Sequence, residues 1–90
     1  MIRLSGQLIC ADAQQAAIVV AHLPEHIRLS RAEAGCLHFD VTPTDDPLVW
    51  QVDETFTDQA AFDLHQQRTR ASEWWTATAA IRREFRVLGV

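Results

Sequence analysis

The hydrophobic pattern changes its period several times along the chain, and the order of these changes limits the fold more than any other feature. Residues 2–10 alternate apolar and polar side chains, which indicates a strand with one buried face. Asp12 can cap a following helix, and Gln15 stands three residues later as in a capping box. One helical stripe is expected from Ala16, Val20, Leu23 and Ile27. Pro24 interrupts it, so we expect a kink or two helical pieces.

The segment RAEAGCLHFDV, residues 31–41, changes from helix to strand at its single glycine. Before Gly35 the residues are typical of a helix end, and after it the period is two. Alternation predicts one apolar face, formed by Leu37, Phe39 and Val41. The opposite face would carry a thiol, an imidazole and a carboxylate, from Cys36, His38 and Asp40. Such a face is expected either to line a pocket or to pack against a second buried surface.

The second half of the chain repeats the same two periods. The segment TPTDDP supplies a turn, and residues 48–56 alternate again, which predicts a hairpin. Thr57 or Asp58 can begin a helix that runs to about Arg68. Ser72 can begin a short helix, and the last ten residues read as a closing strand.

The resulting order of elements is β-α-β-β-α-β, the split βαβ arrangement of ferredoxin-like folds. It predicts an α+β fold with an antiparallel four-stranded sheet, in the spatial order 4-1-3-2, and with helices on one face only. We expect a single domain over residues 1–90. The uncovered face of the sheet would then need a partner, and a second copy of the chain is the expected one.

Composition supports an oligomer and excludes several classes of partner. The chain has 90 residues, of which 48% are hydrophobic, a high share for a domain that buries only part of its surface. The formal net charge is −4, and the eight cations are scattered arginines, so no nucleic-acid partner is expected. No apolar run is long enough to span a membrane. Two cysteines are too few for a disulfide scaffold, and we expect a cytoplasmic protein with reduced thiols.

The segment HLPEH, residues 22–26, matches the H-x-x-E-H pattern of one class of zinc peptidases. Pro24 lies between the two histidines and disturbs the regular helix that their metal geometry requires. We therefore interpret this segment as a solvated, kinked helix end and expect no metal site.

His65 is a candidate general base. It follows Phe62 by three residues on the predicted second helix, so both side chains share a face that looks onto the sheet. A partly desolvated imidazole that titrates near neutral pH suits proton transfer. The alternative is a structural histidine that is hydrogen-bonded to backbone at the edge of the core.

Two further features leave alternatives open. Trp74 and Trp75 diverge by about 100° around a helix, so at most one of them faces the core squarely. Trp74 can fill the core above Thr78 and Ile81, with Trp75 at an interface, or the pair can form an aromatic wall for a flat ligand. Glu54 lies on an otherwise apolar strand face, so we expect an arginine or a hydrogen-bond partner for it, in a structural pair.

Three segments together resemble the antibiotic biosynthesis monooxygenase family: RAEAGCLHFDV, then DP, then WQVDETFTDQAAFDLHQQR. The resemblance implies a homodimeric α+β barrel that inserts oxygen from O₂ into phenols or hydroquinones without metal or flavin. It assigns the family's helix histidine to His65 and makes Phe62, Trp74 and Trp75 pocket walls. The haem-degrading branch of the family has a haem-ligating histidine near the position of Thr76, which cannot ligate iron, so haem is not expected.

These observations predict a cofactor-independent monooxygenase that acts on a small electron-rich aromatic. His65 is the expected catalytic base, and His38 is a further candidate for the substrate site. The alternative is a non-catalytic homodimer that binds or shields a hydrophobic metabolite, with His65 in a structural role.

Overall fold

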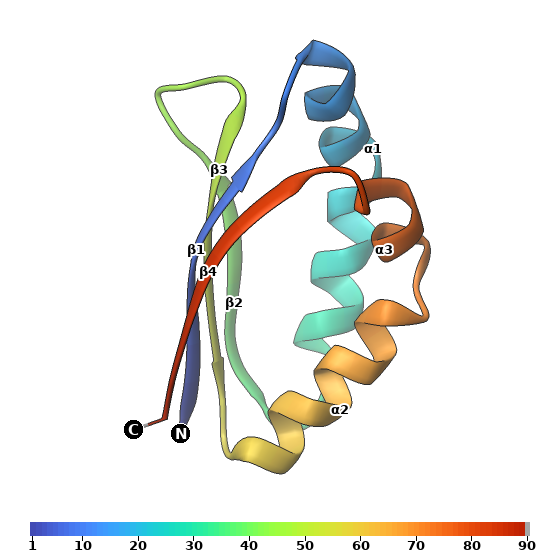
Figure 1. Cartoon of the computed structure of the whole chain (residues 1–90). Helices are drawn as coiled ribbons and strands as arrows, with labels where there is room; N and C mark the ends of the chain where they lie inside the picture. The colour runs from blue at the N-terminus through green and yellow to red at the C-terminus, as the bar shows by residue number, and fades with distance from the viewer. Residues whose placement is uncertain (90) are drawn as a thin grey trace.

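The computed structural model describes residues 1–89 and confirms the predicted order of elements. The elements are β1 (Ile2–Ile9), α1 (Ala13–Arg31), β2 (Cys36–Pro43), β3 (Val49–Phe56), α2 (Gln59–Arg70), α3 (Glu73–Thr78) and β4 (Arg82–Gly89). All strand pairs are antiparallel, and the order across the sheet is β2-β3-β1-β4. The three helices cover one face of this sheet (Figure 1). The chain therefore has the ferredoxin-like α+β fold that its periodicity predicts.

Each helix begins at a side chain that caps it. Asp12 accepts a hydrogen bond from the backbone N–H of Gln15, Asp58 caps α2 in the same way, and Ser72 caps α3. These caps satisfy backbone donors that have no partner inside the helix. Each cap contacts a backbone N–H three residues later in the chain, so the caps could be predicted from the sequence alone.

Helix α1 differs from the prediction in two respects. It runs as one element from Ala13 to Arg31 with Pro24 inside it, so the two-piece alternative is wrong. Its buried side chains are Val19, Leu23, His26 and Ser30. Val20 is 61% exposed, and its predicted place in the buried stripe is also wrong. Val19 and Val20 precede Leu23 by four and three residues, and both spacings fit a helical stripe. Packing against the sheet and α3 determines that Val19 is the buried one.

Strand β2 carries a β-bulge that changes the predicted faces. The register with β3 shifts between Cys36 and His38. A bulge adds one residue to a strand, so side chains before it move to the opposite face. Phe39 is buried under the helices as expected, whereas Leu37 is exposed, and Cys36 packs against the core. The predicted faces therefore hold only from His38 onward.

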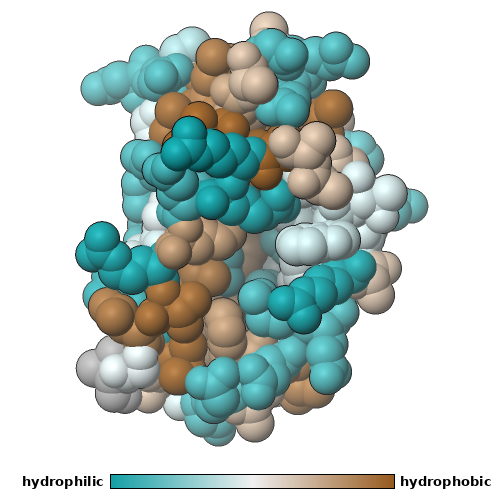
Figure 2. Space-filling view, viewed as in Figure 1, coloured by the Kyte–Doolittle hydropathy of each residue, from teal (hydrophilic) through white to brown (hydrophobic). Residues whose placement is uncertain are grey.

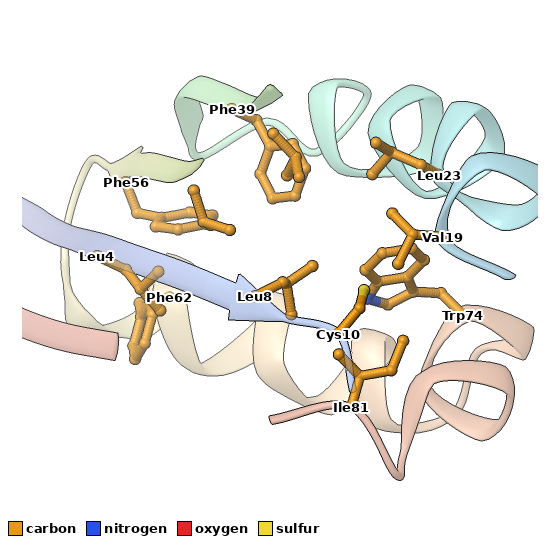
Figure 3. Packing of buried hydrophobic residues seen from close by; sticks show 12 residues of the cluster. Leu4, Leu8, Cys10, Val19, Leu23, Phe39, Phe56, Phe62, Trp74 and Ile81 are labelled. Atoms are coloured by element: carbon orange, nitrogen blue, oxygen red, sulfur yellow. The ribbon is translucent and has the colours of Figure 1, made fainter. Parts of the chain in front are cut away.

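The hydrophobic core lies between the sheet and the helices. Figure 3 shows Val19 of α1 next to the ring of Trp74 of α3, and both belong to the same cluster as Leu23 and Ile81. The two cysteines lie at opposite ends of the sheet, because Cys36 is aligned through Phe56 with the start of β1 and Cys10 follows its end. No helix in residues 1–89 is long and apolar enough to cross a membrane.

Candidate active site

A pocket of about 150 Å³ lies between the sheet and the helices. Its lining comes from all four strands and all three helices: Leu4, Leu8, His26, Val41, Val52, Glu54, His65, Gln66, Thr69, Trp74, Trp75, Arg83 and Phe85. Trp75 and Phe85 are more than one third exposed, so they mark the side on which the pocket meets solvent. Figure 2 shows a hollow on the face where β4 lies opposite α2.

His65 projects from α2 into this pocket and is 2% exposed. Its Nδ1 lies 2.7 Å from Oε1 of Glu33. The second oxygen of Glu33 accepts a hydrogen bond from Nε of Arg68 at 2.5 Å. A carboxylate paired with arginine is ionised and can only accept, so Nδ1 of His65 carries the hydrogen. The other ring nitrogen, Nε2, is then left as the acceptor.

The surroundings of Nε2 keep the imidazole neutral. Burial lowers the pKa of His65 below its usual value, and the positive charge of Arg68 acts in the same direction. The Glu33 carboxylate opposes both effects without reversing them. Nε2 lies 3.3 Å from the hydroxyl of Thr69. His65 therefore presents an unprotonated nitrogen at neutral pH, as a general base requires.

Glu54 projects from β3 into the same pocket. It is 6% exposed, and its Oε1 lies 3.4 Å from Nε2 of His65 without a hydrogen-bond partner in residues 1–89. Burial raises the pKa of Glu54 to about 8, and the nearby charge of Glu33 adds to this rise. Glu54 is thus a neutral carboxylic acid at pH 7.

Oε1 of Glu54 has no hydrogen-bond partner in residues 1–89, so the predicted structural pair for Glu54 is wrong. Arg68 could have been the arginine partner of Glu54, but it forms its ion pair with Glu33 instead. Nη2 of Arg68 also donates to the hydroxyl of Ser30, so two of its three nitrogens are directed toward α1 and the loop after it, and Nη1 has no hydrogen-bond partner in residues 1–89. The ion pair with Arg68 is therefore made by Glu33, which contacts Nδ1 of His65, and Glu54 faces the pocket.

His26 forms another part of the wall. Its ring lies parallel to that of Trp74, with 4° between the planes and 4.6 Å between the centroids. Burial lowers the pKa of His26 to about 3, and the charges of Arg68 and Arg83 add to this effect. The prediction that HLPEH is a solvated helix end is therefore wrong for His26. Its spacing of three from Leu23 and four from Ser30 is the signal that was missed.

Arg83 lies on β4 with its guanidinium group turned toward the end of α3. It donates to the backbone oxygens of Thr78 and Ile81 and to the hydroxyl of Thr78. The guanidinium also lies 5.2 Å from the ring centroid of Trp75. These contacts hold Trp75 at the side of the pocket, and no signal in the sequence distinguished Arg83 from its neighbouring arginines.

The structure brings some of the sequence-predicted site residues together and separates others. His65, Trp74 and Trp75 all line the pocket. Phe62 packs against Phe56 in the core, 5.5 Å between ring centroids, and is not part of the lining.

His38 lies on the opposite face of the sheet. Its Nε2 is 2.8 Å from a carboxylate oxygen of Asp40, and a shallow depression of about 280 Å³ borders both residues. Within residues 1–89, no group of three or more His, Cys, Asp or Glu side chains is arranged to hold a metal ion.

The fold and the site define a small ferredoxin-like α+β protein with a pocket between its sheet and helices that carries an imidazole and aromatic walls. The chain belongs to the antibiotic biosynthesis monooxygenase family, whose sequence model matches residues 1–77. No curated protein has a significant sequence match to this chain.

Solved structures agree with this fold. A candidate antibiotic biosynthesis monooxygenase from Nitrosomonas europaea superposes with a TM-score of 0.85 at 17% identity, over 100% of this chain and 98% of its own. A candidate member from Deinococcus radiodurans gives 0.78 at 20% identity, over 100% and 92%. SnoaB, a cofactor-independent oxygenase from Streptomyces nogalater, gives 0.81 at 13% identity, over 99% and 91%. At these identities the likeness establishes the fold.

Proposed function

We propose that this protein is a cofactor-independent monooxygenase that oxidises a small electron-rich aromatic with O₂. The observation that carries the proposal is the state of His65. Its Nδ1–H is held by Glu33, its Nε2 is unprotonated, and Nε2 lies on an aromatic-walled pocket. A base in this position can take the proton of a phenol, and the resulting phenolate is rich enough in electrons to react with O₂ itself.

The size of the pocket favours a single aromatic ring. Its volume is about 150 Å³, and an apolar cavity of roughly that size holds benzene. Trp74 and Trp75 supply flat surfaces against which such a ring can lie. Phe62 contacts Phe56, whose ring lies 4.8 Å from that of His65, so this pair packs behind the imidazole. A phenol or hydroquinone therefore fits the site without rearrangement, whereas a polycyclic substrate would need the Trp75 side to open.

The overall reaction balances without a cofactor. A phenol loses its O–H proton to Nε2 of His65, and the phenolate passes electrons to O₂ so that one oxygen atom bonds to a ring carbon. The hydrogen of that carbon leaves as a proton, the O–O bond breaks, and the outer oxygen leaves as water. The products are a quinone and water, so four electrons leave the phenol and O₂ accepts all four. The protein contributes orientation, the base and exclusion of solvent.

We also propose that the protein works as a homodimer in the cytoplasm, with the uncovered faces of the two sheets in contact. This face carries polar side chains from every strand, including Arg3, Asp53, Asp40 and Arg86. An interface here would rest on paired charges and hydrogen bonds. Sedimentation at micromolar concentration should show two chains. His38 should resist diethyl pyrocarbonate until the protein unfolds; a stable folded monomer with a reactive His38 would contradict the dimer.

Oxygen uptake tests the proposed activity. The purified protein is mixed with a panel of phenols and hydroquinones in buffer containing a chelator, and autoxidation without protein is subtracted. We expect consumption of one O₂ for each quinone formed, and none under argon. If saturating ligands bind and no member of the panel is oxidised faster than in buffer, the non-catalytic binding function is correct instead.

A further inference from the structure

Glu54 is a polar group of the pocket that the proposed reaction does not use. Its side chain is more than nine-tenths buried, and Oε1 has no hydrogen-bond partner in residues 1–89. A buried polar atom without a partner is costly, and a ligand can supply the missing contact. Glu54 also lines the pocket directly, so a bound ring would meet it.

The groups around Glu54 leave it as a donor. The nearby charges and titratable groups come from four elements and one loop: Glu33 after α1, His26 of α1, Cys36 of β2, His65 and Arg68 of α2, and Arg83 of β4. His26 and His65 are neutral, and Glu33 is paired with Arg68.

Arg83 lies far along the sheet from Glu54. Arg83 is aligned with Leu8 and Glu54 with Leu4, a separation of four residues or about 13 Å along β1. No cation therefore compensates an ionised Glu54, and the neutral acid, which has an O–H to donate, is the favoured form.

We propose that Glu54 is the hydrogen-bond donor for a carbonyl oxygen of the ligand, and that the site selects aromatic rings that carry an uncharged ketone or quinone oxygen. His65 cannot fill this role, because its Nδ1–H is used by Glu33 and its Nε2 has no hydrogen. The hydroxyl of Thr69 already has an acceptor in Nε2 of His65, whereas Oε1 of Glu54 has no hydrogen-bond partner in residues 1–89.

The spacing of the two groups indicates the class of substrate. Nε2 of His65 accepts and Glu54 donates from positions 3.4 Å apart. One molecule can satisfy both if its hydroxyl and carbonyl oxygens are close neighbours, as in a hydroxyaryl ketone. Because Nε2 accepts one hydrogen bond, the ligand hydroxyl would replace that of Thr69 there. This orientation rests on the proposed function, since it places the reacting hydroxyl at His65. The contact between Glu54 and the carbonyl does not depend on turnover.

Binding of acetophenone labelled with ¹³C at the carbonyl tests the proposal without oxygen. At pH 6.5 the wild-type protein should bind it and shift the carbonyl resonance downfield, as a hydrogen bond from an acid does. Glu54→Leu should weaken binding about tenfold and abolish the shift. Glu54→Gln is the matched control, because its amide N–H still donates. Ethylbenzene, which lacks the oxygen, should bind wild type and Glu54→Leu with similar affinity.

The pH dependence distinguishes the acid from the amide. In wild type the shift should disappear as pH rises through about 8, where Glu54 loses its proton, whereas Glu54→Gln should keep it. Failure of wild type to bind acetophenone, or an unchanged shift in Glu54→Leu, would overturn the proposal. Turnover without any effect of Glu54→Leu on binding would also overturn it and leave the proposed function standing. If acetophenone binds as described and no phenol is turned over, the proposal for Glu54 is supported and the proposed function is contradicted.

Discussion

The imidazole of His26 lies flat against the indole of Trp74, with ring centroids 4.6 Å apart. This stack joins α1 to α3 and forms one wall of the pocket. Nδ1 of His26 has no hydrogen-bond partner in residues 1–89, and the ring is buried. The fold therefore holds a histidine that is neutral over the whole physiological pH range.

His26 should make the protein sensitive to acid. The folded-state pKa is about 3 and the ordinary value is 6.5, so below pH 6.5 the unfolded state binds a proton that the folded state rejects. Stability then falls as pH falls from 6.5 toward 3, and the loss at pH 5 is on the order of 2 kcal/mol. His26→Phe keeps a flat ring and should reduce this loss, measured by urea unfolding at pH 5 and 7. An equal loss in His26→Phe would contradict the assignment, and His22→Phe serves as the control on the same helix.

His65→Gln should lower turnover of any working phenol by a factor of about 10² to 10⁴, the usual contribution of a positioned base. Because burial lowers the pKa of His65, the acidic limb of the wild-type rate profile should lie below pH 6.5 and should vanish in the variant. The fold should survive, which circular dichroism can verify. Near-normal turnover with an unchanged pH profile would mean that the base is another group or that the substrate enters already ionised.

Glu33→Gln tests how His65 is held. The Glu33 carboxylate raises the pKa of His65 and fixes the hydrogen on Nδ1. Its removal should lower the pKa of His65 further and mix the two tautomers, which ¹⁵N NMR of the imidazole detects directly. Arg68 would lose its ionic partner, so a modest loss of stability is also expected. An imidazole whose pKa and tautomer are both unchanged would show that Glu33 does not control it.

The two adjacent tryptophans should respond differently to substitution. Trp74 is 6% exposed, and Trp74→Ala should cost about 3 to 5 kcal/mol of stability, as for other buried aromatic residues. Trp75 is 37% exposed, so Trp75→Ala should cost much less stability and mainly weaken ligand binding. Thermal unfolding and titration with acetophenone separate the two effects. A larger stability loss for Trp75→Ala than for Trp74→Ala would reverse the assignment.

Gly6→Ala should destabilise the pairing of β1 with β4. Gly6 has φ of +154°, and an added Cβ would lie 2.0 Å from the backbone oxygen of Glu84. A methyl group cannot fit there unless the strands separate, so the loss should exceed about 1 kcal/mol. Gly89→Ala is the matched control on the same strand pair, because its nearest contact is 3.7 Å away. Chemical denaturation of both variants gives the comparison, and equal stabilities would contradict it.

Local signals in the sequence determined the order and type of the elements. The caps at Asp12, Asp58 and Ser72 act within three residues, and the alternating strands show their period directly. The same reasoning placed His65 on a helix face toward the sheet, and the structure confirms that face. The resemblance to the monooxygenase family, which depends on three short segments, is confirmed by the match over residues 1–77.

The tertiary structure decided the charge state of the site. Arg68 lies within reach of α1 and the loop after it, so it pairs with Glu33, which is 35 positions away in the sequence. Within residues 1–89, Oε1 of Glu54 remains without a hydrogen-bond partner. The bulge in β2 and the burial of His26 likewise depend on how β3 and α3 pack against their neighbours. Periodicity reports which side of an element is buried, but it carries no information on which distant charge a buried carboxyl will meet. That choice depends on distances in the folded chain, because the energy of a buried charge depends on its neighbours in space.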